Sequence, residues 1–250
     1  MGQSERGRVI PPYSAVVLAG GRGTRIAELY PDLPKPLVPT CGQPFLHWVS
    51  AWLAKQGFCD LVYSTGYRAE QIERWASQVP FGTAVRQRCR KEKEPLGTGG
   101  GVIHCMDLCS ENFLVLNGDS MVLTDVAPMI EMVESGRCEA AMIGLHVADA
   151  ARYGTLLTDR DGRLLAMREK QPGPGVINAG VYFLSRTLLA LFPEGEPVSM
   201  EIDIIPGLLR GGVKVGVQVA VAPFLDIGTP QSVILAEEFI RNNSHFVAFP

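Results

Sequence analysis

The sequence lacks the features that mark several large classes of protein. No apolar run reaches the length that spans a bilayer, and the polar segment Met1–Pro12 lacks the apolar core of a signal peptide. Arg6 stands where a myristoylation signal that begins at Gly2 would carry serine or threonine. The formal net charge is only −3, so no basic field favours nucleic acid. We therefore expect a cytoplasmic protein whose partners include neither a membrane nor a nucleic acid.

Paired cysteines are also missing. The six cysteines are scattered, form no Cys-x-x-Cys pair and join no histidine cluster with the spacing of a zinc site. We expect reduced, mostly buried thiols, which are typical of a reducing compartment. No linker, repeat or low-complexity tract divides the 250 residues, so the sequence predicts one domain over 1–250.

What the sequence does contain is an alternation of short apolar runs and longer amphipathic stretches. Strands are predicted at about 14–18, 60–64, 112–116 and 140–146, and helices at about 43–57, 70–77 and 125–135. The second half adds a hairpin with the turn Asp159–Gly162, a strand at about 176–184, and helices at about 200–210 and 230–242. This order predicts an α/β fold with a Rossmann-like, doubly wound sheet that is mixed but mostly parallel.

A glycine-rich turn follows the first apolar strand. Backbone N–H groups in such a turn can approach phosphate oxygens closely, and Arg22 and Arg25 add fixed positive charge. The turn has neither the Gly-Lys-Ser/Thr of a Walker A loop nor the order G-x-G-x-x-G. We interpret it as a phosphate-binding turn, with an ordinary tight turn as the alternative. The predicted nucleotide-binding residues here are Leu18, Ala19, Gly20, Gly21, Arg22, Gly23, Thr24 and Arg25.

Lys35 lies between two prolines shortly after this turn. Each proline restricts its own φ and the residue before it, so Lys35 is held on an extended backbone. A lone lysine is usually a solvated surface residue. One that is fixed next to a phosphate-type turn is better explained as a positioned cation, which would neutralise charge during attack on a phosphate.

Two aspartates far apart in the sequence are candidate metal ligands. Asp119 ends a buried strand, at the carboxyl edge where open α/β sheets bind ligands, and Asp226 lies between an apolar run and a helix N-terminus. Two carboxylates that converge on phosphate oxygens suit Mg²⁺, which keeps waters and takes few protein ligands. The alternative for each residue is a helix-cap or turn aspartate.

The segments Gly20–Arg25 (GGRGTR) and Pro34–Pro39 (PKPLVP) resemble the signature of the sugar-1-phosphate nucleotidyltransferase family. Seven later segments agree with the family pattern in order and extend the resemblance over nearly the whole chain. They are 94–101 (EPLGTGGG), 116–119 (LNGD), 152–154 (RYG), 169–170 (EK), 178–182 (NAGVY), 201–203 (EID) and 226–230 (DIGTP).

The resemblance implies a nucleotide-diphospho-sugar transferase fold that joins a sugar 1-phosphate to a nucleoside triphosphate and releases pyrophosphate. It implies a nucleotide-binding half at about 13–135 and a sugar-phosphate-binding half at about 136–250. It also implies catalytic roles for Arg25, Lys35 and Asp119, with Mg²⁺ held by Asp119 and Asp226. The further nucleotide-binding residues are Pro95, Leu96, Gly97, Thr98, Asn117 and Gly118. The sugar-phosphate-binding residues are Tyr153, Gly154, Glu169, Lys170, Asn178, Gly180 and Glu201.

Within the family, the segment 92–100 and the short chain are most similar to bacterial guanylyltransferases that act on D-glycero-α-D-manno-heptose 1-phosphate. GTP is therefore the expected nucleotide and GDP-heptose the expected product. The alternatives are a hexose or N-acetylmuramate 1-phosphate as acceptor, with UTP, dTTP or GTP. A silent regulatory relative would have lost the cations or carboxylates, and a nucleotide-sugar glycosyltransferase would carry a D-x-D motif, which the Asp119–Met121 segment lacks. The oligomeric state stays open, since this fold often forms homodimers.

Overall fold

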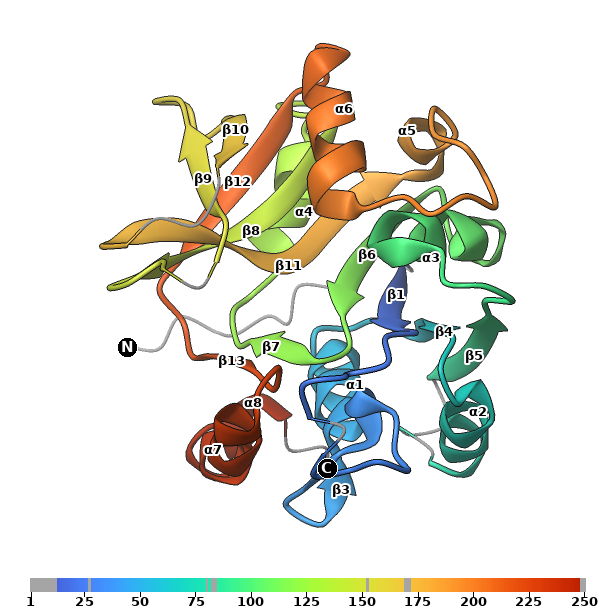
Figure 1. Cartoon of the computed structure of the whole chain (residues 1–250). Coiled ribbons are helices and arrows are strands. Elements are labelled where there is room, and N and C mark those ends of the chain that lie inside the picture. Colours follow the sequence, from blue (N-terminus) through green and yellow to red (C-terminus); the bar gives the residue numbers. More distant parts are fainter. Residues whose placement is uncertain are drawn as a thin grey trace, which may run out of the picture.

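The computed structural model describes residues 13–26, 28–79, 81, 85–151, 153–168 and 172–247 (Figure 1). Within these residues, nine strands form one mixed sheet with helices on both faces. The strands are β1 (Ser14–Ala19), β4 (Asp60–Thr65), β5 (Arg86–Lys91), β6 (Asn112–Asn117), β8 (Ala140–Val147), β9 (Thr155–Thr158), β10 (Leu164–Arg168), β11 (Gly175–Ser185) and β12 (Val215–Ala220).

The order along the sheet is β10-β9-β11-β6-β1-β4-β5, and β8 pairs with β11 and β12. Strands β6, β1, β4 and β5 run parallel to one another, so their carboxyl ends lie at one edge. Strand β11 runs antiparallel to both β6 and β8 and joins the two parts of the sheet. The prediction of a Rossmann-like, mixed α/β fold is therefore confirmed.

The remaining elements are helices and short strand pairs. The α-helices are α1 (Phe45–Lys55), α2 (Ala69–Gln78), α3 (Gly97–Cys105), α4 (Ala127–Glu134), α5 (Arg186–Leu189), α6 (Ile205–Arg210), α7 (Pro230–Asn242) and α8 (Ser244–Val247). Turns of other helix types are η1 (Lys35–Leu37), η2 (Met106–Leu108) and the π-helical η3 (Met200–Ile204). The short strands are β2 (Pro39–Thr40), β3 (Gln43–Pro44), β7 (Ser120–Val122) and β13 (Phe224–Asp226).

Alternate residues of the central strands pack into two separate hydrophobic cores, one on each face of the sheet. In β1, Ala15 and Val17 join a core with α1, α2, α4 and α7, whereas Val16 joins a core with α3, α5 and α6. All three side chains are fully buried. This explains why β1 is apolar after Ser14, as expected of a strand covered on both faces.

Several elements differ from the sequence prediction. Lys35, which was expected on an extended backbone, begins the 3₁₀ helix η1. The first long helix begins at Phe45, because Gln43–Pro44 pairs with Pro39–Thr40 as a small hairpin. The segment 200–210 is not one helix but a π-helical turn followed by α6. Strand β5 was not predicted, because its sequence RQRCRK has no apolar alternation. It is an edge strand, and Arg86 and Arg88 pair with Asp60.

Candidate active site

Two neighbouring cavities open at the edge of the sheet where β1 and β6 end. The larger cavity has a volume of about 440 Å³ and the smaller cavity about 320 Å³, and both are lined by Asn117 and Asp119. The larger cavity is also lined by Arg25, Lys35, Ser120, Tyr153, Gly154, Met167, Arg168, Asn178, Ala179, Gly180, Glu201, Ile202, Phe224 and Asp226. The smaller cavity is also lined by Leu18, Gly20, Gly21, Glu92, Pro95, Gly97 and Thr98.

The structure brings together the two aspartates that the sequence analysis singled out. Strand β6 ends next to β1, where the Gly118 N–H donates to the Leu18 carbonyl at 2.8 Å. The chain then continues as β7, which pairs antiparallel with β13 so that Ser120 lies opposite Asp226. The Ile227 N–H donates to the Asp119 carbonyl at 3.0 Å. The short pair β7–β13 therefore places residues from distant parts of the chain at one point.

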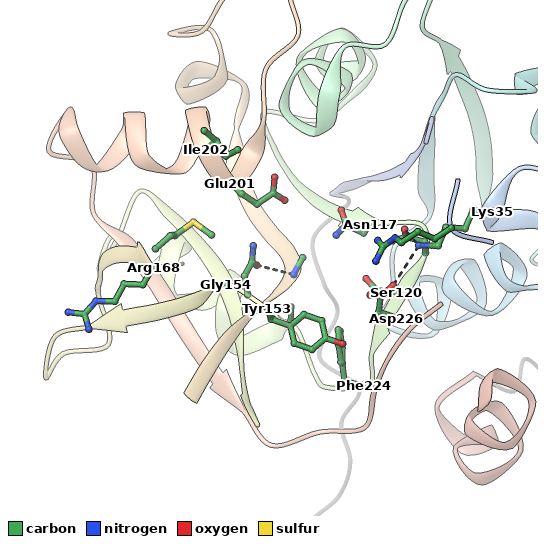
Figure 2. Close-up of a pocket in the computed structure, with 16 residues that line it drawn as sticks. Lys35, Asn117, Ser120, Tyr153, Gly154, Arg168, Glu201, Ile202, Phe224 and Asp226 are labelled. Atoms are coloured by element: carbon green, nitrogen blue, oxygen red, sulfur yellow. Dashed lines mark hydrogen bonds and ion pairs between the residues drawn. The ribbon is translucent and has the colours of Figure 1, made fainter. Parts of the chain in front are cut away.

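Lys35 lies between these two carboxylates. Its Nζ is 2.5 Å from Asp119 Oδ2 and 3.6 Å from Asp226 Oδ1, and the residue is only 8% exposed. Figure 2 shows Lys35 and Asp226 on one side of the larger cavity and Glu201 on the other. Lys35 and the two aspartates form a compact cluster with one excess negative charge.

This cluster also fits a divalent metal. Across the described part of the chain, no three histidine, cysteine or acidic side chains are grouped so that they could hold a metal ion. Mg²⁺ does not require such a group, since it is commonly held by one or two carboxylates together with water and substrate phosphates. Asp119 and Asp226 supply that donor set beside an open cavity.

The glycine-rich turn contributes to both cavities, but its two arginines separate. Gly20 and Gly21 line the smaller cavity, whereas Arg25 lines the larger one. Arg22 lines a recess of about 190 Å³, which Lys93 also lines and which shares Gly20 with the smaller cavity. The other predicted residues that line neither cavity are Ala19, Gly23, Thr24, Leu96 and Gly118.

Gly23 nevertheless has a structural reason to be glycine. Its φ is +61°, and a Cβ at this position would lie 2.8 Å from Lys35 Cβ. The turn therefore packs directly against the side chain of Lys35. This contact fixes the start of the lysine side chain relative to the glycine-rich turn.

Glu92 is a cavity residue that the sequence analysis did not single out. Its carboxylate lines the smaller cavity and accepts hydrogen bonds from Ser64 Oγ at 2.9 Å and from the Leu96 N–H at 3.1 Å. A Cβ on Gly101 would lie 2.8 Å from Glu92 Oε1. The only signal in the sequence was an acidic residue just before the glycine-rich segment 97–101.

A second hydrogen-bonded network crosses from the larger to the smaller cavity. Asn178 Nδ2 donates to the Tyr182 hydroxyl at 2.6 Å, and that hydroxyl donates to Glu201 Oε1 at 3.2 Å. Glu201 Oε2 accepts from Thr98 Oγ1 and from Ser199 Oγ, both at 2.9 Å. Burial, and then the charge of Glu201, raise the pKa of Tyr182 well above its ordinary value. The phenol therefore stays protonated and acts as a donor.

Gly180 allows β11 to approach the end of β6 closely. Its φ is +71°, and a Cβ here would clash with Asn117 Nδ2. A side chain would therefore meet both a strained backbone region and the amide of Asn117. The glycine thus lets β11 lie close to Asn117, which lines both cavities.

The larger cavity has further walls that the sequence analysis missed. Ser120, Met167, Arg168, Ala179, Ile202 and Phe224 line it, although none was predicted as a site residue. Ile202 is 75% exposed, which is unusual for an isoleucine. In Figure 2 the Arg168 side chain extends away from the Lys35 side of the cavity. The predicted residues Tyr153 and Gly154 do line this cavity, and the predicted pair Glu169–Lys170 lies outside the described residues.

Comparison with known proteins supports the motifs over almost the whole chain. A model of the nucleotidyl transferase family matches residues 14–243. D-glycero-α-D-manno-heptose 1-phosphate guanylyltransferase of Aneurinibacillus thermoaerophilus is 32% identical over 91% of this chain and 98% of its own length. Mannose-1-phosphate guanylyltransferase of Mycobacterium tuberculosis is 33% identical over 93% of this chain, which spans only 64% of that protein.

Solved structures agree with this result. The crystal structure of HddC from Yersinia pseudotuberculosis matches with a TM-score of 0.80 and 33% identity, over 90% of this chain and 98% of that chain. The same protein in complex with GMP-PN matches equally well. Within the described residues of this chain, no helix has the length and apolar character needed to cross a membrane.

Proposed function

This chain belongs to the nucleotidyl transferase family and is a sugar-1-phosphate nucleotidyltransferase, and on that premise we propose that it makes GDP-heptose in the cytoplasm from GTP and D-glycero-α-D-manno-heptose 1-phosphate. The observation that carries the proposal is the cluster of Lys35, Asp119 and Asp226 at the border of two joined cavities. A cation and two carboxylates at such a border suit phosphoryl chemistry between two bound phosphates.

The proposed reaction is an in-line displacement at phosphorus. A phosphate oxygen of the sugar 1-phosphate forms a bond to the α-phosphorus of GTP. The bond from that phosphorus to the bridging oxygen breaks, and pyrophosphate leaves with the electron pair. No general base is required, because the sugar phosphate is already an anionic nucleophile. Catalysis then depends on positioning and charge neutralisation.

Each part of the site has a proposed role in this reaction. The glycine-rich turn and Arg25 bind the triphosphate, and Lys35 neutralises charge that develops at the α-phosphate. Asp119 and Asp226 would hold Mg²⁺, which supplies further neutralisation of phosphate charge when it is bound. The nucleotide thus lies in the half at about 13–135 and the sugar phosphate in the half at about 136–250.

The acceptor is proposed to lie in the larger cavity. Asn178 and Glu201 offer hydrogen bonds to sugar hydroxyl groups there. The predicted sugar and phosphate ligands Glu169 and Lys170 follow directly after β10, whose last residue Arg168 also lines this cavity. Tyr153 and Gly154 form part of the same wall.

Glu92 supports guanine as the base. Guanine carries two adjacent donors, N1–H and the N2 amino group, which match the two oxygens of a carboxylate. Uracil and thymine carry a single ring N–H between two carbonyl oxygens, which a carboxylate would repel. Glu92 keeps lone pairs for such a contact, since ionised carboxylates accept about four hydrogen bonds and two are used within the protein.

The heptose acceptor is supported by relatives that this chain matches over their whole length. Two heptose 1-phosphate guanylyltransferases are covered to 98% and 99%, whereas the mycobacterial mannose 1-phosphate enzyme is covered to 64%. Mannose 1-phosphate is the second candidate acceptor, because that enzyme is 33% identical to this chain. Both acceptors carry the manno configuration and would use the same charged residues.

The test is a matrix of substrates assayed by pyrophosphate release. GTP, UTP, dTTP and ATP are each combined with heptose, mannose, glucose and N-acetylmuramate 1-phosphates, with Mg²⁺ and with a chelator. We expect the highest kcat/KM for GTP with the heptose phosphate and no turnover in the chelator. A preference for mannose 1-phosphate would replace the acceptor but keep the reaction. Turnover of no pair would contradict the proposed reaction itself.

A further inference from the structure

We propose that Lys35 occupies, in the free protein, the position between Asp119 and Asp226 that a divalent metal takes once nucleotide is bound. Lys35 and the metal would then compete for one carboxylate pair. The inference rests on the proposed function, because the metal site is part of it. It goes further by stating that the lysine controls when the metal can enter.

The distances support a shared position. Asp119 Oδ2 and Asp226 Oδ1 both face the Lys35 ammonium, at 2.5 Å and 3.6 Å. The side chains of the three residues are 10%, 36% and 23% exposed, in the order Lys35, Asp119 and Asp226. A metal held by both carboxylates would approach them from the same space. Two cations cannot occupy that space, because like charges so close repel strongly where solvent is partly excluded.

The lysine can leave without any rearrangement of the fold. Its backbone is held by Pro34 and Pro36 and by the Leu37 N–H, which donates to the Pro34 carbonyl at 2.9 Å. Gly23 packs against its Cβ. The ammonium, however, stands at the end of a flexible four-carbon side chain. Rotation about side-chain bonds alone is sufficient to move the charge away from the carboxylates.

Binding of a triphosphate would favour movement of the Lys35 ammonium away from the two carboxylates. In the free protein, moving Lys35 would leave two carboxylates close together without a cation, which is unfavourable. Triphosphate oxygens in the adjoining cavity offer the ammonium another anionic partner, and the vacated carboxylates then accept the metal. Metal and nucleotide should therefore bind cooperatively, and the size of this coupling should depend on Lys35.

Arg25 provides a matched comparison. It lines the same cavity as Lys35 and carries the same charge. The ion pairs within 4.0 Å that the described residues form with Asp119 and Asp226 both come from Lys35. Replacing Arg25 lowers the positive charge of the cavity without emptying the position between the carboxylates. The two variants thus separate direct competition from a general electrostatic effect.

The experiment measures Mn²⁺ binding to the full-length protein by electron paramagnetic resonance, without nucleotide and with a non-hydrolysable GTP analogue. Without nucleotide, we expect Lys35→Met to bind Mn²⁺ at least about tenfold more tightly than wild type, within the range of typical coupling between sites. We expect Arg25→Met to change the affinity by less than about threefold. The gain in Mn²⁺ affinity caused by the analogue should shrink in Lys35→Met.

Equal or weaker Mn²⁺ binding by Lys35→Met in the absence of nucleotide would overturn the inference, as would an equal gain in Arg25→Met. If Lys35→Met does not fold, Lys35→Gln removes the charge and keeps a polar group, and the same outcomes apply. The readout uses no sugar phosphate. If the lysine variants bind Mn²⁺ more tightly but the wild-type protein turns over no acceptor, this inference holds and the proposed reaction is rejected.

Discussion

The two joined cavities are built from different kinds of groups. Three of the nine residues that line the smaller cavity are glycines, namely Gly20, Gly21 and Gly97, whose backbone is open to a ligand. The larger cavity is walled by side chains on strands and turns, such as Asn178 and Glu201. Phosphates are common to all nucleoside triphosphates, and backbone N–H groups suffice to bind them. Side chains are needed where one sugar must be distinguished from another. Substrate specificity should therefore change when side chains of the cavities are replaced. The rate of the transfer reaction should depend instead on Lys35, Asp119 and Asp226, which lie where the two cavities meet.

The largest effect is expected at that border. Lys35→Ala should lower kcat by roughly two to three orders of magnitude, the usual cost of deleting one electrostatic contact to a transition state. The other residues that line the larger cavity remain in this variant, so KM for the sugar phosphate should change far less than kcat. Steady-state kinetics with each substrate varied in turn would measure this. Lys214→Ala, at an exposed lysine, is the control and should leave kcat unchanged. Near-normal turnover of Lys35→Ala would remove the assigned role.

Glu92 tests whether the smaller cavity, three of whose nine lining residues are glycines, also contains a side chain that selects the base. Glu92→Gln replaces one oxygen by an amino group, so it can no longer accept from both guanine donors. We expect the preference for GTP over UTP to fall by about 10- to 100-fold, which is the usual discrimination of one bidentate contact. The ratio of kcat/KM values for the two nucleotides measures it.

Glu94→Gln is the matched control for this change. Glu94 is exposed and lines the recess near Arg22 but not the smaller cavity, whereas Glu92 lines both. The same chemical replacement there should leave the nucleotide preference unaltered. If the two variants behave alike, net charge rather than contact with the base determines the preference.

Gly180 tests the wall that both cavities share. Gly180→Ala should lower the free energy of unfolding by about 1–3 kcal/mol for its positive φ, and by more because its Cβ would crowd Asn117. Gly136 has the same φ of +71°, but a Cβ there would have no atom within 4 Å, so Gly136→Ala isolates the backbone contribution. Urea denaturation of both variants gives the difference. Equal losses in the two variants would show that contact with Asn117 does not matter.

The sequence predicted the site residues that follow long buried strands better than those that are placed by short strands. Asp119 and the glycine-rich turn follow buried parallel strands, so their position at the sheet edge followed from the strand order. The meeting of Asp119 with Asp226 was expected from the resemblance to known motifs and from the ligand preference of Mg²⁺, but no pattern in the sequence showed how they meet. It depends on β7 and β13, strands of three residues whose pairing has no periodic signal. Short-range patterns therefore predicted the parts of the site but not how they meet.

Other residues were missed for a related reason. Glu92 enters the cavity because Ser64 and the Leu96 N–H hold its carboxylate, and neither contact is visible in a linear pattern. The sequence analysis predicted no helix from Gly97, in a segment rich in glycine, which disfavours helix. It forms α3 because the Gly99 and Gly100 N–H groups both bind the Val198 carbonyl, at 2.8 Å and 3.0 Å. Tertiary contacts decided both outcomes.

The smallest effect should come from Tyr182, which tests whether the two cavities are independent. Tyr182→Phe removes the hydroxyl between Asn178 and Glu201 and with it two hydrogen bonds, each worth about 1 kcal/mol. We expect KM for the sugar phosphate to rise about three- to tenfold and KM for GTP to rise less. Thr98→Val removes the contact that Glu201 makes on the nucleotide side, so KM for GTP should rise more than KM for the sugar phosphate.

The pH dependence of the same variants gives a further test. Because the raised pKa keeps Tyr182 protonated, the difference in KM between wild type and Tyr182→Phe should stay constant from neutral to mildly alkaline pH. A difference that vanishes as the pH rises would mean that the phenol ionises. Equal effects of both variants on both substrates would mean that Glu201 couples the two cavities.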